Sequence, residues 1–429
     1  MKKLLILYPH FPPSNLAGVH RPRLFAQHLP FFGWEPVILT VNEEYYEEPL
    51  DYNLVKLLPS SLRIEKVKAF QVIRPRIIGD IGLRAFFQLY KRAKQMIQSE
   101  RIDFLYIPIP SFYCALLGRR LHHSTGIQYG IDYIDPWVHY FPGSDRLFSR
   151  HWFSTKVAQL LEPIAVKKAS LITGVAAGYY EPVLDRNPKL KHQAVCGAMP
   201  YGGERADHDQ LTQLDIQPYL FSKKTNKIQL VYAGAMLPKA YSLLEAIFKS
   251  MQAQPELVGQ VEFHFIGTGK ATNDPQGFNI KPLAENYGLY QSVVFEYPKR
   301  IPYLDVLVHL KQADGVFILG STEPHYTPSK AYQGILSGKP ILAVLHKKST
   351  AVNVLQQSNA GIVLTIDEES NAVVIADKFP SFLQRFFVFA RQFSPQQINQ
   401  TVFDDWSAKS ITGQLTELLN SAILKNETK

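Results

Sequence analysis

The sequence has few cysteines and no long apolar run, and both absences narrow the class of protein. Its two cysteines, Cys114 and Cys196, lie far apart among 429 residues. Two thiols build neither a disulfide framework nor a thiolate metal cage, which favours a reducing compartment. No stretch reaches the roughly 18 consecutive apolar residues of a membrane-spanning helix. The apolar start after Met1-Lys2-Lys3 is short and has no small-residue cleavage site, so we expect a buried first strand and a cytoplasmic protein.

The overall composition is that of a globular protein with an anionic partner. Hydrophobic residues make up 46% and charged residues 19%, which argues against disorder on a large scale. A chain of 429 residues is expected to form two domains. The net charge of +9 fits nucleic acid, a membrane surface or a phosphorylated substrate. The basic residues are spread along the chain with no DNA- or RNA-binding motif, so we expect no nucleic-acid partner.

Short apolar runs alternate with helical periodicity along the whole chain. In the first half the predicted strands begin at Lys3, Glu35, Asp103, Ile127 and Ser170. In the second half they begin at Ile228, Val261, Val293, Ala313, Pro340 and Gly361. Strands separated by helices predict βαβ crossovers, and therefore two doubly wound α/β domains with mainly parallel sheets.

A polar interval divides these two halves. We predict an N-terminal domain at 1–205, a linker at 206–227 and a C-terminal domain at 228–400. The amphipathic end of the chain, 401–429, is expected to form a helix that crosses back to the first domain.

The loops that follow strands are the places where open α/β sheets bind ligands. In the first such loop, Gly18 precedes a predicted helix, and Arg21 and Arg23 add positive charge nearby. Free amides at a helix start favour anions, although Gly18 fits a simple tight turn equally well.

Two loops of the second half carry lysines close to helix starts. In YAGAMLPKAYSLLEAI, Lys239 follows the strand-end Gly234. A lysine at a helix N-terminus opposes the helix dipole unless an anion binds there, although a solvated lysine is the plain alternative. In GSTEPHYTPSKAYQGILSGKPILAVL, Pro328 begins a predicted helix, with Ser329 and Lys330 in its first turn. Free amides, a hydroxyl and an ammonium group converge there, which predicts a diphosphate site.

Taken in order, these motifs resemble those of a known enzyme family. They are YPHFPPSNLAGVHRPRLFAQHLPFFGWEPVILT, YIDPW at 133–137, YAGAMLPKAYSLLEAI, FIGTG and PSKAYQGILSGKPILAV. Over nearly the whole chain they resemble glycosyltransferases built from two facing Rossmann-like domains (the GT-B fold). The retaining, bacterial, mannosyltransferase-like group is the most similar.

The resemblance implies a nucleotide-sugar donor in the C-terminal domain, an acceptor in the N-terminal domain and transfer in the cleft. Its glycine elements map to Gly234 and Gly267, and its diphosphate-neutralising lysine maps to Lys239. Contacts to phosphate and nucleoside map to Ser329, Lys330 and Tyr332.

In the N-terminal half, which the resemblance makes the acceptor side, we place Gly18, His20 and Arg21 in the acceptor site or the cleft. Asp135, in YIDPW, would orient the acceptor hydroxyl or touch the donor sugar as the catalytic residue. An aspartate that simply begins the Pro136-Trp137 turn is the alternative.

The sequence departs from the family at a pair of glutamates separated by seven residues. The second glutamate is replaced by Gln333, and counting back gives His325, with Glu323 nearby but out of register. A glutamine still hydrogen-bonds a ribose hydroxyl, without the charge. Either the donor contacts are altered or catalysis is lost. We favour altered contacts, because the phosphate-binding residues remain, and we include Glu323 and Gln333 in the donor site.

Two segments mix basic and apolar residues at helical spacing: RPRIIGDIGLRAFFQLYKRAKQMI from Arg74 and DRLFSRHWFSTKVAQLL from Asp145. Such segments suit an anionic membrane surface or a lipid-linked acceptor. The alternative is an ordinary amphipathic helix that faces its own core.

The sequence thus predicts a glycosyltransferase that moves sugar from a UDP- or GDP-linked donor to a glycan or lipid-linked acceptor in bacterial polysaccharide or glycolipid synthesis. We expect a retaining, metal-independent reaction with no cofactor, at the inner face of the membrane with peripheral membrane contact. The 13 histidines show no metal-site spacing. A sugar-nucleotide epimerase of the same architecture and a non-catalytic nucleotide-sugar-binding protein remain alternatives.

Overall fold

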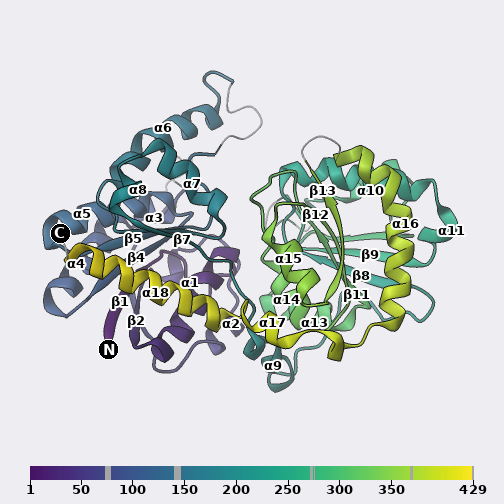
Figure 1. Cartoon of the computed structure of the whole chain (residues 1–429), viewed down its shortest axis with the longest axis horizontal. Coiled ribbons are helices and arrows are strands. Elements are labelled where there is room, and N and C mark those ends of the chain that lie inside the picture. The colour runs from purple at the N-terminus through teal and green to yellow at the C-terminus, as the bar shows by residue number, and fades with distance from the viewer. Residues whose placement is uncertain (73–78, 140–145, 271–273, 275, 368–370, 428–429) are drawn as a thin grey trace. The chain divides into compact units, whose positions relative to one another are not determined.

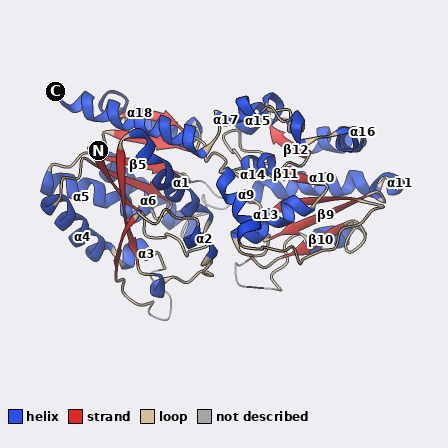
Figure 2. Ribbon diagram, turned by 90° about the horizontal axis from the view of Figure 1, so that it is seen from below, coloured by secondary structure: helices blue, strands red, loops and turns tan. Residues whose placement is uncertain are grey.

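The computed structural model describes residues 1–72, 79–139, 146–270, 274, 276–367 and 371–427. The chain divides into two compact units, one formed by Met1–Tyr201 with Ala408–Lys429 and the other by Gly202–Ser407. Each unit is a parallel sheet with helices packed on its faces (Figures 1 and 2). The predicted fold class, with two Rossmann-like domains and a C-terminal helix that returns to the first, is confirmed.

The first sheet contains seven described strands in the order β3-β2-β1-β4-β5-β6-β7. Apolar side chains fill the central strands, as expected for strands covered on both faces. Their bounds are β1 (Lys2–Leu7), β2 (Trp34–Val41), β3 (Arg63–Val67), β4 (Phe104–Ile109), β5 (Tyr129–Tyr133), β6 (Leu171–Gly174) and β7 (Val195–Ala198). The sequence did not predict the two edge strands, β3 and β7.

Helices cover both faces of this sheet (Figure 1). They are α1 (His20–His28), α2 (Asn53–Lys56), α3 (Ile81–Arg84), α4 (Phe86–Ser99), α5 (Ala115–Thr125), α6 (Arg150–Val166), α7 (Ala177–Arg186), α8 (Leu190–Gln193) and α18 (Ala408–Glu427), with 3-10 turns at Ala17–Val19, Leu29–Phe32, Glu43–Tyr45 and Phe112–Cys114. The returning helix α18 places Ile411, Leu415 and Leu419 one turn apart, in the same buried cluster as strand β1.

The second sheet contains six described strands in the order β10-β9-β8-β11-β12-β13. They are β8 (Ile228–Ala233), β9 (Val261–Ile266), β10 (Val294–Tyr297), β11 (Gly315–Leu319), β12 (Ile341–His346) and β13 (Gly361–Ile366). All six strands were predicted from short, mainly apolar runs, although Glu262 and His264 interrupt the run of β9.

The helices of the second unit cover its sheet in the same way (Figure 2). They are α9 (Arg205–Gln213), α10 (Tyr241–Gln252), α11 (Pro255–Val258), α12 (Lys281–Asn286), α13 (Tyr303–Gln312), α14 (Lys330–Leu336), α15 (Thr350–Gln357), α16 (Asn371–Gln392) and α17 (Gln400–Asp404), with 3-10 turns at Pro238–Ala240 and Pro395–Gln397. The interval 206–227, expected to link the domains, contains most of α9 and belongs to this unit.

Strand order identifies where each sheet can bind a ligand. The order reverses between β1 and β4 in the first sheet and between β8 and β11 in the second. Loops at the carboxyl ends of strands diverge at such a reversal and leave room for a ligand. The loops that carry the predicted site residues leave these strands or their neighbours.

Candidate functional site

Two glycine turns shape the carboxyl edge of the second sheet. Gly234 follows β8 with φ 99°, and Gly267 follows β9 with φ 71°, a region that favours glycine. A Cβ atom placed on Gly267 would lie 4.0 Å from the backbone of Gly234, so the two turns are adjacent. Their amides donate to the carbonyls of Ile266 and Tyr297, both at 2.8 Å. The two glycines therefore determine the shape of this edge of the sheet. Their backbone N–H groups take part in the hydrogen bonding between neighbouring strands.

Lys330 brings a cation to this edge. Its ammonium nitrogen is buried and has no hydrogen-bond partner among the described residues. The nitrogen lies 3.6 Å from the centre of the Tyr232 ring and 3.9 Å from the position of a Cβ on Gly234. Burial lowers the pKa of the Lys330 amine to about 7. The ring stabilises the cation only partly, because no carboxylate of the described residues balances its charge.

A second lysine lies on a neighbouring loop and is paired. Lys239, in the 3-10 turn Pro238–Ala240, places its ammonium group 3.3 Å from the Glu323 carboxylate. Lys239 is 44% exposed and Glu323 is 14% exposed. Glu323 also accepts a hydrogen bond from the Ser321 hydroxyl at 3.3 Å. This contact joins the loops after β8 and β11, and an exposed pair of this kind opens at little cost.

The helix after β11 begins two residues later than predicted. Helix α14 starts at Lys330, and Pro328 and Ser329 precede it. Ser329 is exposed and its side chain makes no capping hydrogen bond. Tyr332 is fully buried. Among the predicted donor-site residues of this segment, Lys330 therefore brings the charged group to the glycine turns.

Gln333 connects α14 to α9. Its side-chain oxygen lies 2.9 Å from Nε2 of His208. Burial lowers the pKa of His208 to about 4, so the ring is neutral at pH 7 and donates its Nε2–H to Gln333. The sequence had assigned Gln333 to the donor and had not singled out His208.

In the first unit, Arg21 is part of a buried ion pair. Arg21 is 1% exposed. Its Nε donates to Oδ2 of Asp132, and its Nη2 donates to Oδ1 of Asp132 at 2.9 Å. Nη1 donates to the carbonyls of Met199 and Pro200 at 2.8 and 3.0 Å. Asp132 also accepts from Thr173 at 2.8 Å. These contacts occupy the guanidinium group inside the unit, so we leave Arg21 out of the proposed acceptor site.

Gly18 lies in the 3-10 turn Ala17–Val19, and His20 is the first residue of α1, the helix that carries Arg21. A Cβ atom on Gly18 would come within 2.3 Å of the Tyr8 hydroxyl oxygen, so glycine is needed here for close packing. His20 is partly buried, with Nδ1 3.5 Å from the Arg23 guanidinium. Burial raises the pKa of Tyr8 well above its usual value, so its hydroxyl stays protonated.

We expect Gly18→Ala to destabilise the protein by about 1–3 kcal/mol, because the methyl group must displace a buried phenol. Urea unfolding measures the change. Tyr8→Phe removes the clashing oxygen, so the double variant Tyr8→Phe/Gly18→Ala should lose less than the sum of the two single losses. Strict additivity would show that the contact with Tyr8 is not the cause.

Asp135 lies just beyond the carboxyl end of β5. The residue reaches solvent, and desolvation of its carboxyl group raises the pKa to about 6. A carboxyl group that titrates near neutral pH suits proton exchange with a hydroxyl. The neighbouring Trp137 is buried, and its ring stacks on Phe112 at 5.8 Å. In the YIDPW motif the tryptophan is therefore structural, and the aspartate is the residue that faces solvent.

The sequence missed a polar pair at the carboxyl ends of β1 and β2. His10 Nδ1 lies 2.7 Å from the Glu48 carboxylate, and the Ser14 hydroxyl donates to the same oxygen. Burial alone would raise the pKa of Glu48, but the hydrogen bonds from His10 and Ser14 hold it below its usual value. The histidine in YPHFPP is the signal that could have identified this pair.

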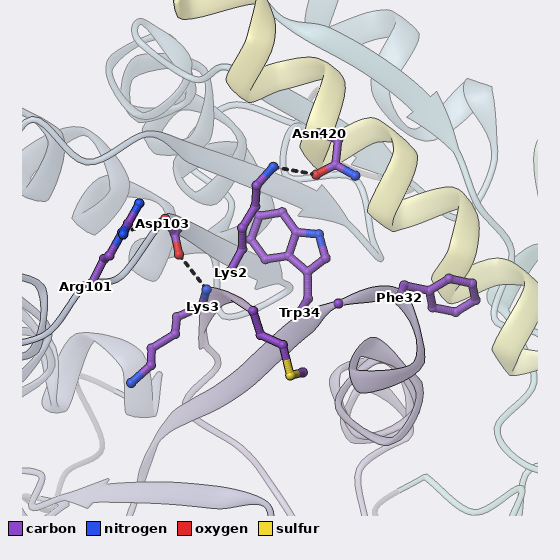
Figure 3. Close-up of a pocket in the computed structure, with 9 residues that line it drawn as sticks. Lys2, Lys3, Phe32, Trp34, Arg101, Asp103 and Asn420 are labelled. Carbon is purple, nitrogen blue, oxygen red and sulfur yellow. Dashed lines mark hydrogen bonds and ion pairs between the residues drawn. The ribbon is translucent and has the colours of Figure 1, made fainter.

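A hollow of about 600 Å³ lies at the opposite, amino-terminal edge of the first sheet (Figure 3). Lys2 donates to Asn420 at 2.9 Å across it, and the backbone amide of Lys3 donates to Asp103 at 2.7 Å. Trp34 forms part of its wall. These polar groups already have partners, and the loops of the candidate site leave the carboxyl ends of the strands. We therefore do not assign the donor-binding site to this hollow.

The described residues also bear on metal binding and on membrane crossing. Among them, no group of three or more His, Cys, Asp or Glu side chains could hold a metal ion. In the same part of the chain, no helix combines the length and the apolar character needed to cross a bilayer.

Comparison with known proteins gives matches in structure only. No protein-family model and no curated protein sequence matches the chain. A glycosyltransferase from Rickettsia africae superposes with a TM-score of 0.61 at 15% identity, covering 99% of both chains. A sucrose-phosphate synthase from Thermosynechococcus elongatus gives 0.64 at 14% identity, covering 98% of this chain and 99% of its own. HepE of Anabaena, in complex with UDP and glucose, gives 0.61 at 16% identity, covering 98% and 100%. The whole chain therefore has the fold of these proteins.

Proposed function

We propose that this protein is a glycosyltransferase that uses a nucleoside diphosphate sugar as donor. The observation that carries the proposal is the buried ammonium group of Lys330 beside the Gly234 turn, which has no hydrogen-bond partner among the residues that the structure describes. A buried cation without a counter-charge is unfavourable, and a bound diphosphate would supply the missing charge. The fold supports the same conclusion, because its structural neighbours include a glycosyltransferase and HepE in complex with UDP-glucose.

The proposed chemistry follows from where negative charge develops. When the bond from sugar to diphosphate breaks, charge builds on the leaving phosphate, and positive groups fixed beside it stabilise that transition state. We assign this role to Lys330 and Lys239. Lys239 turns from Glu323 toward the phosphate, which frees Glu323 to accept hydrogen bonds from hydroxyls of the donor. Ser329 is exposed at the same loop and can donate its hydroxyl to phosphate.

On the acceptor side we assign two groups of the first unit. Asp135, with its pKa raised to about 6 by desolvation, would accept a hydrogen bond from the attacking hydroxyl. The His10–Glu48 pair would hold another hydroxyl of the acceptor, which we propose is a glycan or a lipid-linked sugar. Similarity of the sequence motifs supports a retaining, metal-independent reaction in bacterial polysaccharide or glycolipid synthesis, at the inner face of the membrane.

Donor affinity should depend on pH through Lys330. Its pKa is about 7 in the free protein, and a diphosphate favours the charged amine, so binding takes up a proton above that pH. We expect the dissociation constant of the bound nucleoside diphosphate to rise about tenfold per pH unit between about pH 7.5 and 9. Fluorescence titration across this range measures the slope. Lys239→Met should weaken binding and keep the slope, whereas a flat profile in the unmodified protein would contradict the role of Lys330.

The activity test is a donor panel with product identification. The protein is incubated with UDP- and GDP-linked sugars and bacterial glycan or lipid-linked acceptors, and released nucleoside diphosphate is measured. Release that depends on the acceptor, from one nucleotide class, supports the proposal. A new nucleotide sugar formed without acceptor would identify an epimerase, and binding without turnover would identify a non-catalytic protein.

A further inference from the structure

Helix α6 presents a continuous apolar stripe to solvent. Phe153, Val157, Leu160 and Ile164 are between 40% and 69% exposed. Their spacing of four, three and four residues places them on one side of the helix, within an arc of about 60° at 3.6 residues per turn. Four large apolar side chains in one row form a patch, unlike single exposed residues scattered on a surface.

The stripe is not the side of α6 that packs on the protein. The buried residues of the helix are Thr155, Ala158, Glu162, Ala165 and Val166. At about 100° per residue they centre on the side opposite the stripe. Glu162 is fully buried there and paired with Arg186 at 2.8 Å. One side of α6 packs against the first unit. The apolar stripe is a separate side of the helix, and burying its apolar area requires another binding partner.

The turn before α6 extends the apolar surface. Leu147 and Phe148 are 68% and 77% exposed, and Phe148 adopts φ 60°, which is unfavourable for a bulky residue. The Phe148 and Trp152 rings lie 5.7 Å apart, and those of Trp152 and Phe153 lie 5.0 Å apart. An aromatic cluster with solvent access is typical of the boundary between water and lipid.

Basic residues flank the stripe on both sides. At about 100° per residue, Arg150 lies about 50° from the centre of the stripe and Lys156 about 70° from it on the other side, while Lys167 and Lys168 follow the last residue of the helix. All four are exposed, as is Arg146 in the preceding turn. The acidic residue of α6, Glu162, is buried on the opposite side. The helix and its two flanking turns therefore combine a row of exposed apolar groups with five exposed positive charges.

Of the two segments that mix basic and apolar residues, this one has a row of exposed apolar side chains, whereas Phe87 is the large apolar side chain exposed on the described part of the other. In the other, α4 buries Leu89, Ala93 and Met96 in the core of the first unit, so it is an ordinary amphipathic helix. Residues 74–78 of that segment and Asp145 of this one lie outside the described residues.

We propose that the exposed side of α6, with the turn 146–149, binds the surface of an anionic phospholipid bilayer. The helix lies on the outside of the first unit (Figure 1). Phe153, Leu160 and Ile164 insert at the boundary between headgroups and acyl chains, while the flanking lysines and arginines contact lipid phosphates. A bilayer satisfies the whole row of charges at once, whereas a protein partner would have to match it with a row of acids on both sides of an apolar groove. The inference does not depend on the identity of the donor.

Vesicle flotation of the full-length protein tests this surface. The vesicles are phosphatidylcholine alone, or phosphatidylcholine with about one third phosphatidylglycerol. We expect binding to the anionic vesicles that weakens with salt. Leu160→Ser/Ile164→Ser should lower the partition coefficient about a hundredfold, by loss of two inserted side chains. Lys156→Gln/Lys167→Gln should lower it about thirtyfold on anionic vesicles only.

The matched control is Val373→Ser/Val388→Ser on α16, where both valines are also exposed. This variant should bind like the unmodified protein, and circular dichroism confirms that every variant is folded. Absence of vesicle binding, or equal binding by all variants, would overturn the proposal. Self-association in light scattering that disappears with Leu160→Ser/Ile164→Ser would overturn it as well, because the stripe would then bind a second copy of the chain. The donor assays are unaffected by either outcome.

Discussion

Replacing Lys330 with methionine is expected to stabilise the unliganded protein and to abolish its response to nucleoside diphosphates. Methionine keeps the unbranched side chain beside Tyr232 and removes the buried charge. Within the part of the chain that the structure describes, no carboxylate balances this cation, so its removal relieves a desolvation penalty. Without ligand, we expect the free energy of unfolding at pH 6 to rise by about 2–4 kcal/mol.

The sign of this effect can be checked through its pH dependence. The pKa of Lys330 is about 7 in the folded chain, and a free lysine titrates near 10.4. The unfolded state therefore binds more protons between these values, and stability from this group rises with pH. The gain in free energy of unfolding that Lys330→Met gives over the unmodified protein should therefore be largest below about pH 7. It should vanish near about pH 10. Urea unfolding of both proteins at several pH values measures it.

The same variant should lose ligand-induced stabilisation. A saturating nucleoside diphosphate at about 100 times its dissociation constant should add about 2.7 kcal/mol to the unmodified protein and almost nothing to Lys330→Met. Lys239→Met is the control for charge, since its ammonium group is exposed and already paired, and it should change unliganded stability by less than about 1 kcal/mol. A Lys330→Met variant that is less stable than the parent and binds nucleotide normally would contradict the assignment.

The second large effect is expected at the Arg21–Asp132 pair. Arg21→Met should destabilise the protein by about 3–5 kcal/mol, because it leaves a buried carboxylate without its cation and two carbonyls without a donor. Thermal and urea unfolding measure the loss.

A compensating change distinguishes charge from packing. In Arg21→Met/Asp132→Leu no buried charge is left unpaired, so this variant should recover part of the lost stability. If Arg21→Met instead left stability unchanged and lowered only transfer, the guanidinium would act on the acceptor, as the sequence had suggested.

The strands of the second sheet were all predicted, including its edge strands β10 and β13, whereas the two edge strands of the first sheet were missed. The apolar runs of β8 to β13 mark every described strand of the second sheet. The strands β3 and β7 were missed because neither contains a long apolar run. β3 reads RIEKV with alternating charges, and β7 has four residues. In both cases the sheet, and not local sequence, decides the conformation.

The sequence predicted which loops carry the candidate site. It did not predict which charged side chains pair with one another. Spacing in the sequence placed Lys330 and Lys239 after the strands at the reversal of the second sheet. It could not distinguish them, because only the fold shows that Lys239 meets Glu323 while Lys330 meets the Tyr232 ring. Arg21 was assigned to a ligand because its buried partner, Asp132, lies 111 residues away.

The most direct test of the central claim is calorimetric titration of the full-length protein with UDP and GDP at pH 8, in two buffers of different ionisation enthalpy. At this pH the diphosphate is fully ionised and Lys330, with its pKa of about 7, is largely neutral. We predict one site per chain, selective for one base, with uptake of about 0.9 proton in the unmodified protein and none in Lys330→Met. Absence of binding by either nucleotide, or binding without proton uptake that survives Lys330→Met, would contradict a diphosphate site at Lys330.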